Sequence, residues 1–92
     1  MDKQPRKYFC PCCGYDTLDE EPPGTYQICK ICFWEDDPIQ FYDPNYKGGA
    51  NTVSLIQAQK NFEMFGACEK KFIENVMPPT PENIRNPNWK KY

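Results

Sequence analysis

The chain has 92 residues, six cysteines, no histidine and a net charge of −2. A chain of this length forms one small domain with a limited core, which a metal or disulfides often supplement. The lack of histidine excludes the Cys–His and Ser–His pairs of nucleophilic enzymes. No apolar run is long enough to span a membrane.

The charge is unevenly distributed along the chain. Residues 1–15 carry a net charge of +2, residues 16–43 carry −7 and residues 44–92 carry +3. The polar start of the sequence lacks the apolar segment of a signal peptide. We therefore expect a cytoplasmic protein whose thiols are reduced, with a secreted disulfide-bonded protein as the alternative.

The first elements in chain order are expected to be two short strands, each leading into a pair of cysteines. Residues 1–7 are expected to form a flexible lead-in, and Tyr8 and Phe9 to begin a strand that leads into Cys10. Residues 19–24 predict an exposed loop. Residues 25–28, Thr-Tyr-Gln-Ile, alternate polar and apolar side chains and predict the second strand.

The rest of the chain is expected to contain a long loop followed by one or two helices. Residues 35–51 are rich in Asp, Pro, Gly and Asn and predict the loop. Ser54 at the N-cap and Gly66 after the last turn predict a helix over residues 55–65. A shorter helix near residues 69–76 would place Phe72, Ile73 and Val76 on one face, and three prolines end it. We expect the domain to cover residues 8–79, followed by a polar tail or strap over residues 80–92.

The cysteines provide the strongest signal. Two pairs follow the pattern C-x2-C-x15-C-x2-C, which lies within the spacing range of tetrahedral zinc sites. The pattern predicts a small α+β metal-stabilised domain, in which a zinc-ribbon-like pair of knuckles with short strands is followed by one or two helices. We expect one Zn²⁺ per chain, held by Cys10, Cys13, Cys29 and Cys32.

Two other roles for the cysteines remain open. Iron also binds four thiolates, as in rubredoxins, but those proteins have a longer gap between the two pairs than this chain. A dithiol oxidoreductase with Cys10-Pro-Cys12-Cys13 as its C-x-x-C motif would need a strand before the motif and a helix after it, and the sequence from Gly14 onward is a poor helix start. Cys12 and Cys68 are expected to be packing residues.

We do not expect an enzyme. Four thiolates leave no open position on the metal for a water molecule, and the sequence has no phosphate-binding glycine loop. The adjacent acids Glu35, Asp36 and Asp37 resemble a solvated surface more than a general acid–base pair. No small-molecule substrate is inferred.

Three ordered motifs resemble the bacterial cysteine-rich CPCC family. They are Cys-Pro-Cys-Cys-Gly-Tyr at residues 10–15, Ile-Cys-x-x-Cys-Phe-Trp-Glu-Asp-Asp at residues 28–37, and Asn-x-x-Ser-Leu-x-x-Ala-x-x-Asn-Phe-x-x-Phe-Gly-Ala at residues 51–67. The resemblance covers residues 8–79. It implies a small bacterial, intracellular domain that partners other proteins, with some relatives from toxin–immunity neighbourhoods. The family positions present here are Trp34, Glu35, Asp36, Asp37, Asn51 and Asn61. The chain departs from the family pattern at Cys68, where a small polar residue is more usual, and in its longer polar C-terminal end.

The acidic middle segment suggests a basic protein partner. Acidic and aromatic side chains alternate there, as in many protein interfaces. The residues expected to bind the partner are Trp34, Glu35, Asp36, Asp37, Phe41, Tyr42 and Asp43. The leading hypothesis is a non-catalytic zinc-binding interaction module, plausibly an immunity or inhibitor protein against a basic, nuclease-like toxin or effector.

Nucleic-acid binding or regulation by a zinc ribbon is the alternative function. It would use the lysines of the C-terminal half, with Trp89 and Tyr92 stacking on bases. Those lysines are dispersed and form no clear basic cluster in the sequence, so nucleic acid is the weaker expectation.

Overall fold

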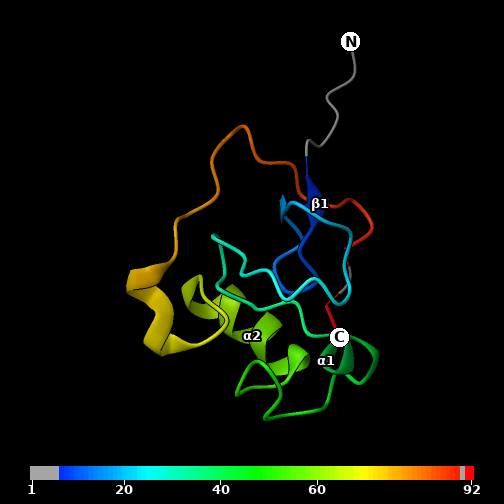
Figure 1. Cartoon of the computed structure of the whole chain (residues 1–92). Helices are drawn as coiled ribbons and strands as arrows, with labels where there is room; N and C mark the ends of the chain where they lie inside the picture. Colours follow the sequence, from blue (N-terminus) through cyan, green and yellow to red (C-terminus); the bar gives the residue numbers. More distant parts are fainter. Residues whose placement is uncertain (1–6, 90) are drawn as a thin grey trace.

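The computed structural model describes residues 7–89, 91 and 92. The lead-in predicted over residues 1–7 therefore lies outside the described residues, except for Lys7. The described chain forms a small α+β domain, as predicted (Figure 1). Its elements are strands β1 (Tyr8–Phe9) and β2 (Asp16–Leu18), helices α1 (Pro38–Tyr42) and α2 (Leu55–Phe65), and the 3₁₀ helix η1 (Lys70–Asn75).

The sheet consists of β1 and β2, which pair antiparallel with Tyr8 opposite Leu18 and Phe9 opposite Asp16. Strand β1 forms as predicted, whereas β2 was not expected from the sequence. Tyr8 is exposed and Phe9 is half-buried, while all three residues of β2 are buried. The sheet therefore covers the core through β2.

The second predicted strand, over residues 25–28, is wrong as a regular strand. Tyr26 has a φ of 57°, which breaks the extended backbone. The segment still pairs with the chain after Cys32: Ile28 bridges Glu35, and the Cys29 amide donates to the Trp34 carbonyl at 2.9 Å. Residues 25–28 therefore form one side of an irregular hairpin around the second cysteine pair, in place of the predicted strand.

Helix α1 lies within the segment that the composition predicted to be a loop. Asp37 is its N-cap, with Oδ1 accepting from the Ile39 amide at 2.8 Å, and Pro38 opens the first turn. An acidic cap followed by proline is a recognised helix start. The helix has five residues, so it is too short to show a 3.6-residue period.

Helix α2 has the bounds that its capping residues predicted. The Ser54 hydroxyl accepts from the Gln57 amide, and Gly66 ends the helix at a φ of +80°. The reciprocal half of the capping box differs, because Gln57 Nε2 donates to Asn61 Oδ1 at 2.8 Å. Leu55 and Ala58 are buried, which points this face into the core.

The second predicted helix is present as η1. Phe72 packs against Phe33, with ring centroids 4.6 Å apart. The expected apolar face is incomplete, since Ile73 is 42% exposed and Val76 is half-buried. In Figure 1, η1 stands to one side of α2.

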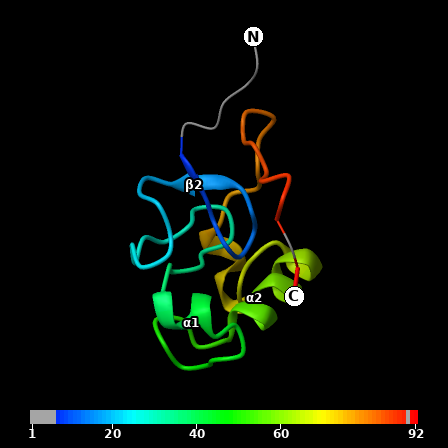
Figure 2. The same ribbon diagram turned by 90° about the vertical axis from the view of Figure 1, so that its right-hand side faces the viewer.

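The C-terminal segment folds back along the sheet as a strap. The Asp16 amide donates to the Ile84 carbonyl at 3.0 Å, and the Asn86 amide donates to the Gly14 carbonyl at 2.7 Å. The strap then continues to the α2 side of the domain (Figure 2), where the Tyr92 amide donates to Gln59 Oε1 at 2.9 Å.

The core is built around sulfur. All six cysteines are buried, together with the apolar side chains Leu18, Ile31, Trp34, Leu55 and Ala58. Because the core contains few large aliphatic side chains, a metal is the obvious supplement. Within the described part of the chain, no helix is long and apolar enough to cross a membrane.

Candidate metal centre

Two backbone turns of the same design hold the two cysteine pairs. In the first turn, the Gly14 amide donates to the Cys10 carbonyl at 2.8 Å, and the Cys10 amide donates to the Tyr15 carbonyl at 2.9 Å. In the second, Phe33 donates to Cys29 at 2.7 Å, and Cys29 donates to Trp34 at 2.9 Å. These bonds place the cysteines of each pair on one side of a tight turn.

The fifth residue of each turn has a left-handed backbone. Gly14 has a φ of +81° and Phe33 a φ of +71°. Glycine adopts this conformation freely, whereas for phenylalanine it costs about 1–2 kcal/mol. Phe33 packs on Phe72 of η1, and this contact helps to offset the strain.

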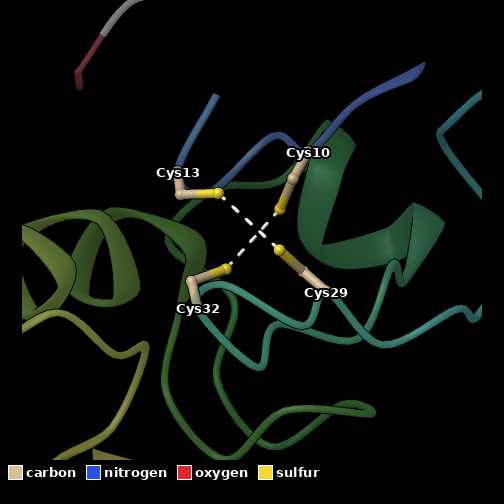
Figure 3. A group of neighbouring side chains, drawn as sticks. All are labelled: Cys10, Cys13, Cys29 and Cys32. Atoms are coloured by element: carbon tan, nitrogen blue, oxygen red, sulfur yellow. Dashed lines mark hydrogen bonds between the residues drawn. The ribbon is translucent and has the colours of Figure 1, made fainter. Parts of the chain in front are cut away.

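The four cysteine sulfurs point toward one another from the two turns (Figure 3). They all lie within 4.8 Å of one another, with Cys10 Sγ 3.6 Å from Cys32 Sγ and Cys13 Sγ 3.7 Å from Cys29 Sγ. A tetrahedral metal with bonds of about 2.3 Å separates its sulfur ligands by about 3.8 Å. A disulfide would need sulfurs about 2.05 Å apart. The spacing therefore fits one metal ion, and these sulfur pairs do not lie at disulfide distance.

The cluster is buried, and without a metal the pKa values of its four thiols are shifted in different directions. Burial raises the pKa of the Cys10, Cys13 and Cys32 thiols well above the ordinary value. Hydrogen bonds from those three thiols, and a weaker one from Thr17, lower the pKa of Cys29. A divalent cation would stabilise all four thiolates by direct coordination.

Thr17 on β2 is a functional residue that the sequence did not reveal. Its hydroxyl donates to Cys29 Sγ at 3.0 Å, and the side chain is buried. A hydrogen bond to a metal ligand orients that ligand and tunes its charge. No spacing signal links Thr17 to Cys29, because the contact depends on β2, which forms only by pairing with β1.

The strap fixes the first turn from outside. The Arg85 guanidinium donates through Nε to the Cys13 carbonyl at 2.9 Å and stacks on Trp89, with its central carbon 4.2 Å from the ring centroid. Trp89 presses on Gly14, where an added Cβ would lie 2.7 Å from the indole. Gln59 of α2 donates to the Pro11 carbonyl at 3.0 Å. The first turn is thus held in place by α2 and by the strap.

Cys12 and Cys68 are fully buried and lie outside the four-sulfur cluster. The Cys68 amide donates to the Cys32 carbonyl at 2.7 Å, and Asn61 Nδ2 donates to the Cys68 carbonyl at 2.9 Å. Burial raises the pKa of the Cys68 thiol, so it stays protonated. This arrangement assigns a structural task to Asn61, one of the family positions: it ties α2 to the second turn.

Three residues expected to bind a partner are buried, and that expectation is corrected. Trp34 is 1% exposed and belongs to the core. Asp36 is 1% exposed, and its Oδ2 accepts from the Thr25 amide and hydroxyl at 2.9 and 2.8 Å. Asp37 is 5% exposed and caps α1 while accepting from the Ala50 amide. The carboxylates of Asp36 and Asp37 therefore accept hydrogen bonds from backbone amides instead of facing solvent.

The other four expected contact residues lie at or near the surface. Tyr42 is 76% exposed, Asp43 is exposed, and Glu35 and Phe41 are half-buried. The backbone of Glu35 is bound on both sides by Asn51, which accepts from its amide at 2.9 Å and donates to its carbonyl at 2.7 Å. Asn51, another family position, therefore shapes the chain after the second cysteine pair.

The arrangement has the chemistry of a closed metal site. It offers four sulfur donors, all at most 1% exposed, and none of its ligand positions opens to solvent. Such sites stabilise a fold and leave no position for a substrate.

Comparison with known proteins agrees with the motifs. The family model described as cysteine-rich CPCC matches residues 8–83, which includes both cysteine pairs, both helices, η1 and the start of the strap. Among curated proteins, no sequence matches the chain. Since the family model covers well over half of the chain, the protein belongs to the cysteine-rich CPCC family.

Proposed function

We propose that the protein is a zinc-stapled, non-catalytic interaction domain that binds a basic protein through an acidic and aromatic surface. The closed four-sulfur centre carries the non-catalytic part of this proposal, because a saturated, buried site serves folding. Zinc is assigned over iron because the gap of fifteen residues between the pairs is shorter than rubredoxins use.

The surface that supports the partner proposal lies beside α1, and we call it the acidic face. The loop before the second cysteine pair packs against this helix: an added Cβ on Gly24 would lie 3.7 Å from Pro38. Figure 2 shows the loop and α1 on the same side of the molecule. Its exposed side chains are Glu20, Glu21, Tyr26, Ile39, Tyr42 and Asp43.

The composition of this face fits a basic partner. Tyr26 is 52% exposed, Ile39 57% and Tyr42 76%, so three large apolar side chains are exposed on the two segments that also carry three exposed carboxylates. Exposed aromatics provide anchors in interfaces, and surrounding acids accelerate association with cations. A nuclease-like toxin is basic because its substrate is acidic, which makes an immunity or inhibitor role the specific form of this proposal.

The test is a binding measurement that uses the intact, metal-loaded chain. Proteins captured from a host extract are purified singly, and their Kd is measured at low and high salt. We expect a basic protein whose affinity falls with salt and drops at least tenfold with Glu20→Lys and Asp43→Lys together. The matched control is Glu74→Lys with Glu82→Lys, two exposed acids outside the acidic face.

Equal binding by the acidic-face variant and the wild type would refute the proposed surface. An inhibitor role adds that the captured protein has nuclease activity, which one molar equivalent of the chain suppresses. Activity that is unchanged by the chain would remove that role. Turnover of a substrate by the chain itself would contradict the non-catalytic assignment.

A further inference from the structure

A groove of about 390 Å³ opens next to the acidic face and beside the first cysteine turn. Strand β1, the Cys10 turn, α1, α2 and the strap all contribute to its walls. Its volume falls within the range of ligand sites. Five aromatic side chains line it: Tyr8, Phe9, Phe41, Trp89 and Tyr92.

The charge of the groove selects one class of ligand. Of the described residues that line it, Glu21 alone is an Asp, Glu, Lys or Arg. Glu21 is exposed and forms no ion pair with any described residue. With a carboxylate and no Lys or Arg among its described lining residues, the groove disfavours phosphates and carboxylates and favours a positive charge.

The aromatic walls favour the same charge. The face of an aromatic ring attracts a cation, by about 0.5–1 kcal/mol at exposed sites and about 2 when water is excluded. The protein already uses this chemistry at the next position, where the Arg85 guanidinium carbon lies 4.2 Å from the Trp89 centroid and 5.2 Å from the Tyr15 centroid. Tyr8 and Tyr92, which also line the groove, are 46% and 57% exposed and add two aromatic rings to it.

The remaining lining groups suit a peptide. Asn86 and Asn88 contribute side-chain amides, which can pair with peptide N–H and C=O groups. Leu55 and Pro22 also line the groove and provide apolar surface for the aliphatic part of a long ligand side chain. A long side chain with a cationic end, carried on an extended backbone, matches all of these features.

We propose that this groove receives a lysine or arginine side chain from an extended segment of the basic partner. The inference deepens the proposed function and rests on it for the identity of the partner. The ligand chemistry stands separately, because it follows from Glu21 and the aromatic walls.

The experiment titrates the zinc-loaded, full-length chain with capped Gly-Lys-Gly and Gly-Arg-Gly tripeptides and follows ¹H–¹⁵N spectra. We expect saturable shifts at the Trp89 indole and at the amides of Phe9 and Asn88, with no response to capped Gly-norleucine-Gly. Glu21→Gln and Tyr92→Ala are each expected to weaken binding about fivefold. The matched controls Glu74→Gln and Tyr46→Ala remove the same groups outside the groove and outside the acidic face, and are expected to leave the affinity unchanged.

Three results would overturn the proposal: equal binding of the norleucine peptide, unchanged affinity of both groove variants, or shifts produced by a nucleotide and not by the cationic peptides. The intact partner separates the two levels of inference. If it binds the wild type and the groove variants equally, the groove assignment fails while the proposed function stands. If no basic partner binds at all, the proposed function fails, and the tripeptide titration still decides the chemistry of the groove.

Discussion

Replacing Thr17 with valine removes one hydrogen bond from the metal centre and preserves the shape of the side chain. Thr17 Oγ1 donates to Cys29 Sγ at 3.0 Å inside a buried environment, and Cys29 is the ligand whose pKa is lowered. A hydrogen bond to a charged group contributes about 1.5–3 kcal/mol. Metal binding and folding are coupled in small metal-stabilised domains, so this loss lowers the apparent metal affinity.

The expected effect is a metal affinity that is roughly 10- to 150-fold weaker, since about 1.4 kcal/mol corresponds to a factor of ten. Competition with a chromophoric chelator measures it. Thr17→Ser keeps the hydroxyl and is expected to retain most of the affinity. The matched control is Thr52→Val, at an exposed threonine, which is expected to bind metal as the wild type does. An affinity of Thr17→Val within twofold of the wild type would refute the role given to this hydrogen bond.

Three further predictions concern stability and pH. Gly14→Ala is expected to destabilise the metal-loaded domain more than Gly66→Ala does in thermal unfolding, because the new Cβ at Gly14 would lie 2.7 Å from Trp89. At Gly66 nothing lies within 4 Å, so only the left-handed backbone costs about 1–2 kcal/mol. Equal losses of stability in the two variants would contradict the contact between Gly14 and the strap. Gln40→Leu is expected to lower the free energy of unfolding by about 3 kcal/mol or more, measured with denaturant. Gln40 is fully buried, and its Nε2 donates to the carbonyls of Tyr46, Asn51 and Val53. A decrease below about 1 kcal/mol would contradict the role given to these hydrogen bonds. Metal affinity is expected to fall as pH is lowered, because coordination needs thiolates and burial raises the pKa of the Cys10, Cys13 and Cys32 thiols. Calorimetry in buffers of different ionisation enthalpy is expected to detect proton release on metal binding near neutral pH, and binding without net proton release would contradict this reasoning.

Local chemistry made part of the fold predictable. The cysteine spacing predicts one metal site, because two cysteines separated by two residues can both reach the same ion from one tight turn. The bounds of α2 followed from Ser54 and Gly66, because capping depends on residues within one turn of the helix end. The start of β1 was also recognised from two adjacent aromatic residues.

Contacts between distant residues account for what the sequence did not reveal. Strand β2 depends on pairing with β1 and on the strap, where Asp16 binds Ile84 across 68 positions. Asp36 and Asp37 look like surface acids in a list of charges, but they are buried because backbone amides of distant loops donate to them. The groove combines β1, α1 and the chain end, so no segment of the sequence shows it alone.

The metal content of the purified protein, measured with the sulfur distances by X-ray absorption, tests the central claim most directly. Four buried sulfurs within 4.8 Å of one another are expected to hold one zinc ion per chain, with four Zn–S bonds of about 2.3 Å and no nitrogen or oxygen ligand. One iron per chain would keep the site and contradict the zinc assignment. A metal-free, folded protein with disulfides between these cysteines would contradict the account as a whole.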